Sequence, residues 1–239
     1  MSKTIVDSLS LVVPVLNEQE IIEETIGVYN SNLKNVAKIY EIIVVDDGSN
    51  DSTPEILKSL RNKNKVIKII THEKNMGVGK ALFDGFKAAR YEWVMHNSAD
   101  QPFDINNLKK IANLFQNSDV IVAVREDRSA NTLFRKLTSL TSLMTVKIFF
   151  GTDIRDFHFI QIYKTSILKN IKIGSKDTFM PAELLITLHK KGYIISQFPA
   201  RFQKRTTGYS KYDNPVRYFI YLKELLKFWW KINSKNHAN

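Results

Sequence analysis

Short apolar runs alternate with amphipathic segments along the first 125 residues, and this alternation is the strongest constraint on the fold. Two β-branched runs, residues 9–16 and 40–45, are each followed at once by polar residues, which is typical of buried parallel strands. Residues 18–36 between them carry apolar side chains at helical spacing. Strand, helix and strand in this order predict a βαβ unit with a right-handed crossover.

The alternation extends into the second half of the chain in a less regular form. Ser52 is placed to cap a helix that begins around Pro54. Further strands are expected at residues 66–70, 93–95, 120–124, 159–163 and 193–200, and further helices at 77–90, 105–115, 132–150 and 182–191. We therefore predict an α/β protein with an open, mostly parallel, Rossmann-like sheet flanked by helices. Residues 1–210 are expected to form one domain, and residues 211–239 a basic amphipathic C-terminal helix.

The charge of the chain is concentrated in its tail. Of the net charge of +11, residues 201–239 carry +7, from nine Lys and Arg against two acids. Lysines interleaved with aromatic residues in residues 217–232 suit an anionic membrane surface, whereas a nucleic-acid binder spreads such charge over a whole face. An ordinary helix packed on the domain or on a second subunit is the competing interpretation, so a homo-oligomer is left open.

The chain has no cysteine, which excludes disulfides, a thiolate nucleophile and Cys-based zinc sites. The N-terminus does not read as a signal peptide, and no run reaches the ~18 apolar residues that span a bilayer. We expect a cytoplasmic protein associated peripherally with the inner face of the membrane.

Polar clusters follow three of the predicted strands, at the edge where sheets of this class bind ligands. They are Asn17-Glu18, the tetrapeptide 46–49 (Asp-Asp-Gly-Ser), and Ser98-Ala99-Asp100. Acidic side chains gathered at one edge repel each other unless a cation or a ligand engages them, so a divalent metal with a diphosphate would suit them. The competing interpretation is that the tetrapeptide is only a turn and a helix cap.

Four segments in chain order, "VVPVLNE", "EIIVVDDGSNDST", "NMGVGKALFDGFKAA" and "SADQPFD", resemble the motifs of family 2 glycosyltransferases with the GT-A fold. The resemblance is greatest to the polyprenyl-phosphate branch, which includes dolichyl-phosphate mannose synthases. It continues through "RDFHFIQIYKTSIL" and "AELLITLHKKGYIISQFPARFQKRTTGYSK", and so covers residues 9–212.

The resemblance implies a nucleoside-diphosphate sugar as donor. The residues placed by it against the nucleotide base are Pro14, Asn17, Glu18 and Asp47, with Asp46 nearby. Residues 75–80 would line the nucleotide pocket, where Gly77 and Gly79 permit close backbone approach and Lys80 counters the diphosphate charge. A helix start with a solvated lysine explains the same segment without a ligand.

The family's metal motif, Asp-x-Asp, appears here as Ser98-Ala99-Asp100. The resemblance implies that Asp100 binds Mg²⁺ or Mn²⁺ bridging the donor diphosphate, and that Ser98 and Ala99 lie beside the donor. Because a hydroxyl replaces the first carboxylate, Ser98 puts metal affinity in question. Asp104 either compensates for it or caps the following helix.

A polyprenyl phosphate acceptor is already ionised near neutral pH and needs positioning more than activation. The resemblance makes Arg125 and Arg135 candidate clamps on the lipid phosphate, and Arg205 and Lys211 part of a loop that closes over the donor. Asp156 lies near the implied acceptor and is the candidate base for a hydroxyl acceptor, whereas pairing with Arg155 is the structural alternative. Glu183 matches a family glutamate at a helix start, where the helix dipole alone accounts for it.

Three functions follow as hypotheses. The favoured one is an inverting transferase that moves a sugar from a UDP- or GDP-sugar to a polyprenyl phosphate. The second is transfer to a hydroxyl of a cell-surface glycan. The third is a catalytically weakened homologue that binds nucleotide or membrane, suggested by Ser98. A nucleic-acid partner is not expected.

Overall fold

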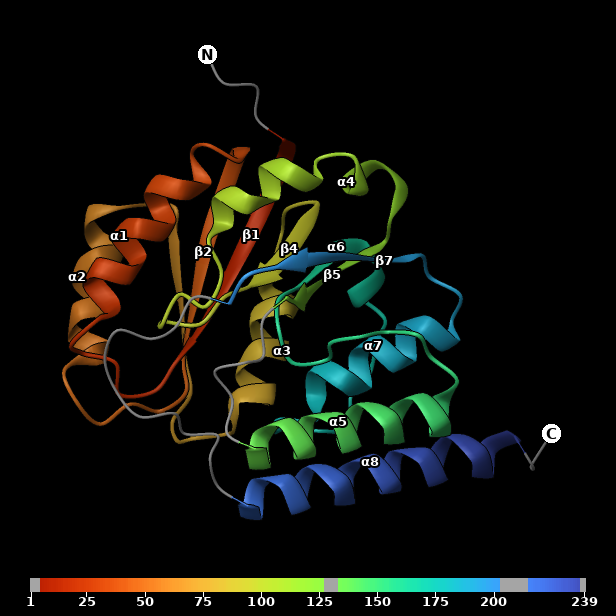
Figure 1. Cartoon of the computed structure of the whole chain (residues 1–239). Coiled ribbons are helices and arrows are strands. Elements are labelled where there is room, and N and C mark those ends of the chain that lie inside the picture. Colours follow the sequence, from red (N-terminus) through yellow and green to blue (C-terminus); the bar gives the residue numbers. More distant parts are fainter. Residues whose placement is uncertain (1–4, 127–132, 203–214, 237–239) are drawn as a thin grey trace.

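The computed structural model describes residues 5–126, 133–202 and 215–236. Seven strands form one sheet in the order β3-β2-β1-β4-β6-β5-β7, and every neighbouring pair is parallel except the two pairs made by β6 (Figure 1). The strands are β1 Val6–Val15, β2 Ala37–Asp46, β3 Ile67–Thr71, β4 Trp93–His96, β5 Val120–Arg125, β6 Gln161–Lys164 and β7 Ile195–Ala200. The prediction of an open, mostly parallel sheet is confirmed.

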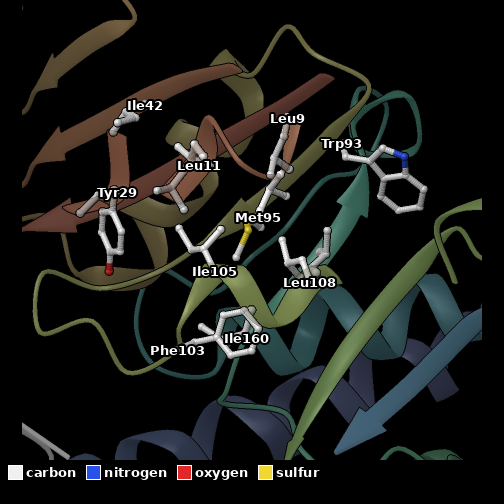
Figure 2. Packing of buried hydrophobic residues seen from close by; sticks show 14 of the residues in the cluster. Leu9, Leu11, Tyr29, Ile42, Trp93, Met95, Phe103, Ile105, Leu108 and Ile160 are labelled. Atoms are coloured by element: carbon white, nitrogen blue, oxygen red, sulfur yellow. The ribbon is translucent and has the colours of Figure 1, made fainter. Parts of the chain in front are cut away.

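Helices cover both faces of the sheet and bury a separate hydrophobic cluster on each. One face carries α1 Ile22–Leu33, α2 Thr53–Lys63, the 3₁₀ helix η1 Ile105–Ile111 and α4 Leu114–Asn117. The other carries α3 Val78–Ala88, α5 Leu133–Phe150, α6 Thr165–Leu168, α7 Met180–Lys190 and α8 Pro215–Asn236. In Figure 2, Leu9, Leu11 and Met95 of the sheet pack against Ile105 and Leu108 of η1. Val12 belongs to the opposite cluster, because successive strand residues face opposite ways.

Helix α8 shares the second core. Its Tyr221, Leu225 and Phe228 are buried there, and it lies beside α5 along one side of the molecule (Figure 1). The Phe228 ring lies 5.6 Å from that of Phe150 in α5. In the described ranges, no helix is long and apolar enough to cross a membrane.

Two local expectations need correction. Residues 105–115 form η1 and the short α4 instead of one continuous helix, and the asparagines at positions 106, 107 and 113 are poor helix formers. Ser52 makes no side-chain cap on α2, and the Asp51 carboxylate instead accepts from the Thr53 amide at 2.9 Å. Helix α6 and the antiparallel direction of β6 were not predicted.

Strand register brings the predicted polar clusters to one edge of the sheet. Val15 pairs with Asp46 across β1 and β2, and Val12 pairs with His96 across β1 and β4. Because β6 runs antiparallel, the segment that leads into it lies at the same edge as the end of β5. The loops after β1, β2, β4 and β5 therefore converge there.

Candidate active site

The loops after β1 and β2 are bound to each other by side-chain hydrogen bonds. Asn17, in a left-handed conformation with φ of 56°, accepts from the Asn50 amide at 2.9 Å, and its own amide donates to Ser49 Oγ at 2.9 Å. Asp46 is buried and accepts from the Ser49 amide at 3.0 Å, which is the turn interpretation of the tetrapeptide. Asn17 is exposed, and Pro14 and Glu18 are half-buried at the same edge.

The Asp47 carboxylate is engaged by three protein donors. Its Oδ1 accepts from the Met76 amide at 2.8 Å, and its Oδ2 accepts from the Gly77 amide at 2.9 Å. Oδ1 also lies 2.7 Å from His72 Nδ1. The Asp47 carboxylate thus holds the backbone of residues 76 and 77 through two hydrogen bonds.

Gly77 and Gly79 are required by protein packing. A Cβ on Gly77, which has a φ of 95°, would lie 2.7 Å from the Lys176 carbonyl oxygen, and one on Gly79 would lie 2.3 Å from that of Asp177. The Lys80 amide donates to the Lys176 carbonyl at 2.8 Å. The close approach inferred for these glycines is therefore made, in this structure, to the segment before α7.

The Lys80 side chain is 35% exposed and has a partner on its own helix. Its ammonium forms an ion pair with Asp84, one turn further along α3. Asp84 Oδ2 also lies 3.0 Å from His72 Nε2. Asp47, His72, Asp84 and Lys80 therefore form a continuous row of alternating acidic and basic groups.

Helix α1 supports the loop after β4. Thr25 Oγ1 donates to the Ala99 carbonyl at 2.7 Å, and the Tyr29 hydroxyl donates to the Ser98 carbonyl. Burial, with the Asp100 charge nearby, raises the pKa of Tyr29 well above its ordinary value, so its hydroxyl stays protonated as a donor. Ser98 and Asp100 are half-buried, whereas Ala99 is buried.

Asp104 is a helix cap. Its Oδ1 accepts from the Asn106 amide at 2.9 Å and from the Asn106 side chain at 3.1 Å. Among the residues that the structure describes, no three His, Cys, Asp or Glu side chains cluster as metal ligands. The other carboxylate of this loop is that of Asp100, which is half-buried.

Arg125 and Asp156, expected at the acceptor, bind each other. Arg125 Nε lies 2.8 Å from Asp156 Oδ2, and Nη2 lies 3.0 Å from Oδ1. Burial alone would raise the pKa of Asp156, but the Arg125 charge and hydrogen bonds outweigh it and lower that pKa. The sequence analysis did not predict this bidentate pair of Asp156 with Arg125. A carboxylate held in this way is poorly suited to be a general base near neutral pH.

The remaining predicted residues either lie away from the carboxyl edge of the sheet or have side chains that the structure does not describe. Glu183 is buried and accepts from the Gly174 and Ser175 amides at 2.9 and 2.8 Å, so it holds the loop before α7. Arg135 belongs to α5, but its side chain is not among those described, and Arg205 and Lys211 lie outside the described residues. Burial lowers the pKa of His96 to about 4, which makes it a neutral core residue near neutral pH.

Four supporting residues escaped the sequence analysis: Thr25, Tyr29, His72 and Asp84. Thr25 and Tyr29 lie on the buried face of α1, where the helical pattern of the sequence shows no functional signal. His72 directly follows β3, and its position after a strand, like that of the three polar clusters, is the signal by which it could have been found.

Comparison with known proteins assigns these motifs to a family. Residues 10–175 match the model of glycosyl transferase family 2. An undecaprenyl-phosphate 4-deoxy-4-formamido-L-arabinose transferase of Pectobacterium atrosepticum is 32% identical over 214 residues, which are 87% of this chain and 63% of that protein. Glycosyltransferase AglD of Haloferax volcanii is 25% identical over 95% of this chain and 38% of its own length. The chain thus spans less than two thirds of these relatives.

Solved structures confirm the GT-A fold. Glucosyl-3-phosphoglycerate synthase of Mycobacterium tuberculosis, in complex with Mn²⁺, UDP-glucose and phosphoglyceric acid, superposes with a TM-score of 0.71 at 16% identity, over 93% of this chain and 80% of that one. The same enzyme with Mg²⁺ and UDP gives 0.68 at 14% identity, over 93% and 79%.

Proposed function

Because the chain belongs to glycosyl transferase family 2, we propose that it is an inverting enzyme that transfers a sugar from a nucleoside-diphosphate sugar to a polyprenyl phosphate. The observation that carries this proposal is the family match over residues 10–175, which includes every loop that converges at the carboxyl edge of β1, β2 and β4. The acceptor class rests on the resemblance to the undecaprenyl-phosphate transferase.

The donor would lie across the loops after β1 and β2. Pro14, Asn17 and Glu18 face it from the first loop, while Asp46 and Asp47 fix the second loop and the 75–77 loop. Lys80 lies at the start of α3, where its ammonium is paired with Asp84. If Lys80 exchanges Asp84 for the donor, its ammonium can bind the diphosphate. A carboxylate oxygen of Asp47 that accepts one further N–H would recognise the base edge.

The residues after β4 fit a divalent cation of the Mg²⁺ or Mn²⁺ type. Mg²⁺ commonly takes one or two protein carboxylates and completes its shell with water and substrate phosphates, so Asp100 alone is a sufficient protein anchor. When bound, such an ion neutralises charge on the departing diphosphate. Thr25 and Tyr29 keep the Ser98–Asp100 backbone in place by donating to the Ala99 and Ser98 carbonyls. The Ser98 hydroxyl would contact a metal-bound water or the ribose.

The acceptor phosphate would approach Arg125. Asp156 engages Nε and Nη2, which orients the guanidinium and leaves the other N–H groups for a second anion. An ionised phosphate oxygen attacks the anomeric carbon directly, so no base is required. Transfer to a glycan hydroxyl would need one, and the lowered pKa of Asp156 counts against that alternative. Arg135, Arg205 and Lys211 remain candidate phosphate ligands.

We also propose that residues 217–232 bind the membrane surface at its cytoplasmic face. Trp230 and Leu226 of α8 are 69% and 50% exposed, and Lys223, Lys227 and Lys231 are exposed along the same helix. Exposed tryptophan among lysines is typical of an interfacial helix.

A donor and acceptor screen tests the function. The protein is incubated with a panel of UDP- and GDP-sugars, with Mg²⁺ or Mn²⁺ or with chelator, and with or without undecaprenyl phosphate. We expect a glycolipid from at least one donor, only when metal and lipid phosphate are both present. Nucleotide binding without transfer to any acceptor would favour the catalytically weakened homologue that Ser98 suggests.

A further inference from the structure

We propose that His72 is a positioning residue for the nucleotide-sugar donor, acting through Asp47 on the backbone of residues 75–77. The inference rests on the proposed function, because it assigns that loop to the donor. His72 follows the end of β3 and is not part of any motif that carries the family resemblance.

His72 bridges two carboxylates on different elements. Its Nδ1 lies 2.7 Å from Asp47 Oδ1, at the end of β2, and its Nε2 lies 3.0 Å from Asp84 Oδ2, on α3. The side chains of His72 and Asp47 are only 11% and 6% exposed, so bulk water cannot replace the His72–Asp47 contact without cost. The Asp84 side chain is 26% exposed. An imidazole that reaches both elements fixes the distance between them.

Hydrogen bonding constrains the ring nitrogens of His72. An ionised carboxylate only accepts hydrogen bonds, so each contact is a hydrogen bond when the ring nitrogen that faces it carries a proton. With both nitrogens protonated, the row from Asp47 through His72 and Asp84 to Lys80 alternates in charge. In every case the His72 ring bridges the two carboxylates.

The consequence for the loop follows from the other contacts of Asp47. The same carboxylate accepts from the Met76 and Gly77 amides, so a change in its orientation moves the backbone that leads into α3. Without His72, Lys80 would be the only partner left to Asp84 in this row. Asp84 would then hold the Lys80 ammonium more strongly, and Lys80 would bind a diphosphate less well. Both effects weaken donor binding and leave the reacting groups at Asp100 and Arg125 in place.

The test combines amide exchange with nucleotide titration of the full chain. His72→Leu removes both contacts, whereas His72→Arg retains a cation with several donors between the carboxylates. Asp84→Asn, on a partly exposed helix surface, weakens one contact and is the second variant if His72→Leu fails to fold. His189→Gln, at the end of α7 and outside this row, is the matched control.

We expect amide exchange of a peptide covering residues 73–80 to accelerate in His72→Leu, with Kd for UDP or GDP and donor KM rising about tenfold and kcat nearly unchanged. His72→Arg should restore most of the affinity, Asp84→Asn should fall between, and His189→Gln should match the wild type. Unchanged exchange in His72→Leu overturns the proposal whether or not the protein proves to be a transferase. Faster exchange with unchanged nucleotide affinity also overturns it. If the wild type binds no nucleotide, the proposed function fails and the donor role fails with it, while the exchange result still reports whether His72 holds the loop.

Discussion

The acidic residues at the sheet edge hold the loops around the proposed site. Asp46, Asp47, Asp104 and Asp156 each accept a hydrogen bond from a backbone amide. Asp156 also orients the Arg125 guanidinium. The loop that carries Asp100 is held by α1 through the Ser98 and Ala99 carbonyls, which keeps the proposed metal ligand in place.

Replacing Asp100 by Ala should abolish transfer, because it removes the carboxylate proposed to anchor the metal. A steady-state assay over a range of Mg²⁺ or Mn²⁺ concentrations measures this. Asp104→Ala is the matched control: it removes a cap worth about 1 kcal/mol, so stability should fall while activity survives. Turnover by Asp100→Ala in chelator at the wild-type rate would refute the metal assignment, and Ser98→Asp should maintain activity or tighten metal binding.

The Arg125–Asp156 pair should make stability depend on pH in the acid range. The folded-state pKa of Asp156 lies below its ordinary value of 3.8, so the pair stabilises the protein fully above that value and the contribution is lost as pH falls through the folded pKa. At pH 7, Asp156→Asn should lower the free energy of unfolding by about 2 kcal/mol, because Arg125 loses its charged partner but keeps some water contact.

Urea unfolding at pH 7 and near pH 3 gives both differences. The deficit of Asp156→Asn should shrink at the lower pH. Asp7→Asn, in an exposed pair with Lys38, should have little effect at either pH. An equal deficit of Asp156→Asn at both pH values would show that the variant acts through packing and not through charge.

At the scale of elements, two buried carboxylates, Asp47 and Glu183, hold the loops on either side of the start of α3. Asp47 holds the amides of residues 76 and 77 from one side, and Glu183 holds those of residues 174 and 175 on the other. The Lys80 amide joins α3 to the second loop at the Lys176 carbonyl. Residues 75–77, proposed to line the donor pocket, are therefore held by contacts between segments that lie far apart in the sequence, which would favour donor binding by positioning the loop beforehand.

Gly79→Ala should disturb this contact, since its new Cβ would meet the Asp177 carbonyl oxygen at 2.3 Å. Overpacking of this kind costs about 1–3 kcal/mol of unfolding free energy, and nucleotide affinity should fall with it. Gly27→Ala in α1 is the opposite case: its Cβ meets nothing within 4 Å, so stability should rise by about 0.5–1 kcal/mol. Urea denaturation and nucleotide titration of the two variants decide the matter, and a neutral Gly79→Ala would contradict the packing argument.

At the scale of the whole molecule, local periodicity was sufficient to predict the parallel part of the sheet. The β-branched runs and intervening amphipathic helices of β1 to β5 follow from residues that are neighbours in sequence. The antiparallel β6 between β4 and β5 does not, because strand order depends on which edges pair after the chain has folded. For the same reason the sequence predicts that Asp47 and Asp156 lie at the site edge, but not which residues bind their carboxylate oxygens. These partners, His72 and Arg125, lie 25 and 31 positions away in the sequence.

The α5–α8 side of the molecule combines a packed and an exposed apolar surface. Trp229 packs on Phe149 of α5, with ring centroids 5.2 Å apart, whereas Trp230 next to it is exposed. On α5, Met144 and Ile148 are 52% and 74% exposed. Truncation before α8 would also strip the buried side of this helix from the second core. Point variants are therefore the sharper test of membrane binding.

The double variant Leu226→Ser/Trp230→Ser should lose most of its binding to anionic vesicles, because two exposed apolar side chains can no longer enter the interface. Electrostatic attraction, about 1 kcal/mol for each Lys or Arg near the surface, should leave a residual affinity that salt abolishes. The control Ile39→Ser/Ile194→Ser removes two side chains that are 54% and 59% exposed on β2 and before β7, and should sediment with vesicles as the wild type does. Co-sedimentation at low and high salt measures all three proteins. If the α8 variant binds vesicles as tightly as the control but elutes as a smaller species in gel filtration, the exposed face of α8 is a contact between subunits.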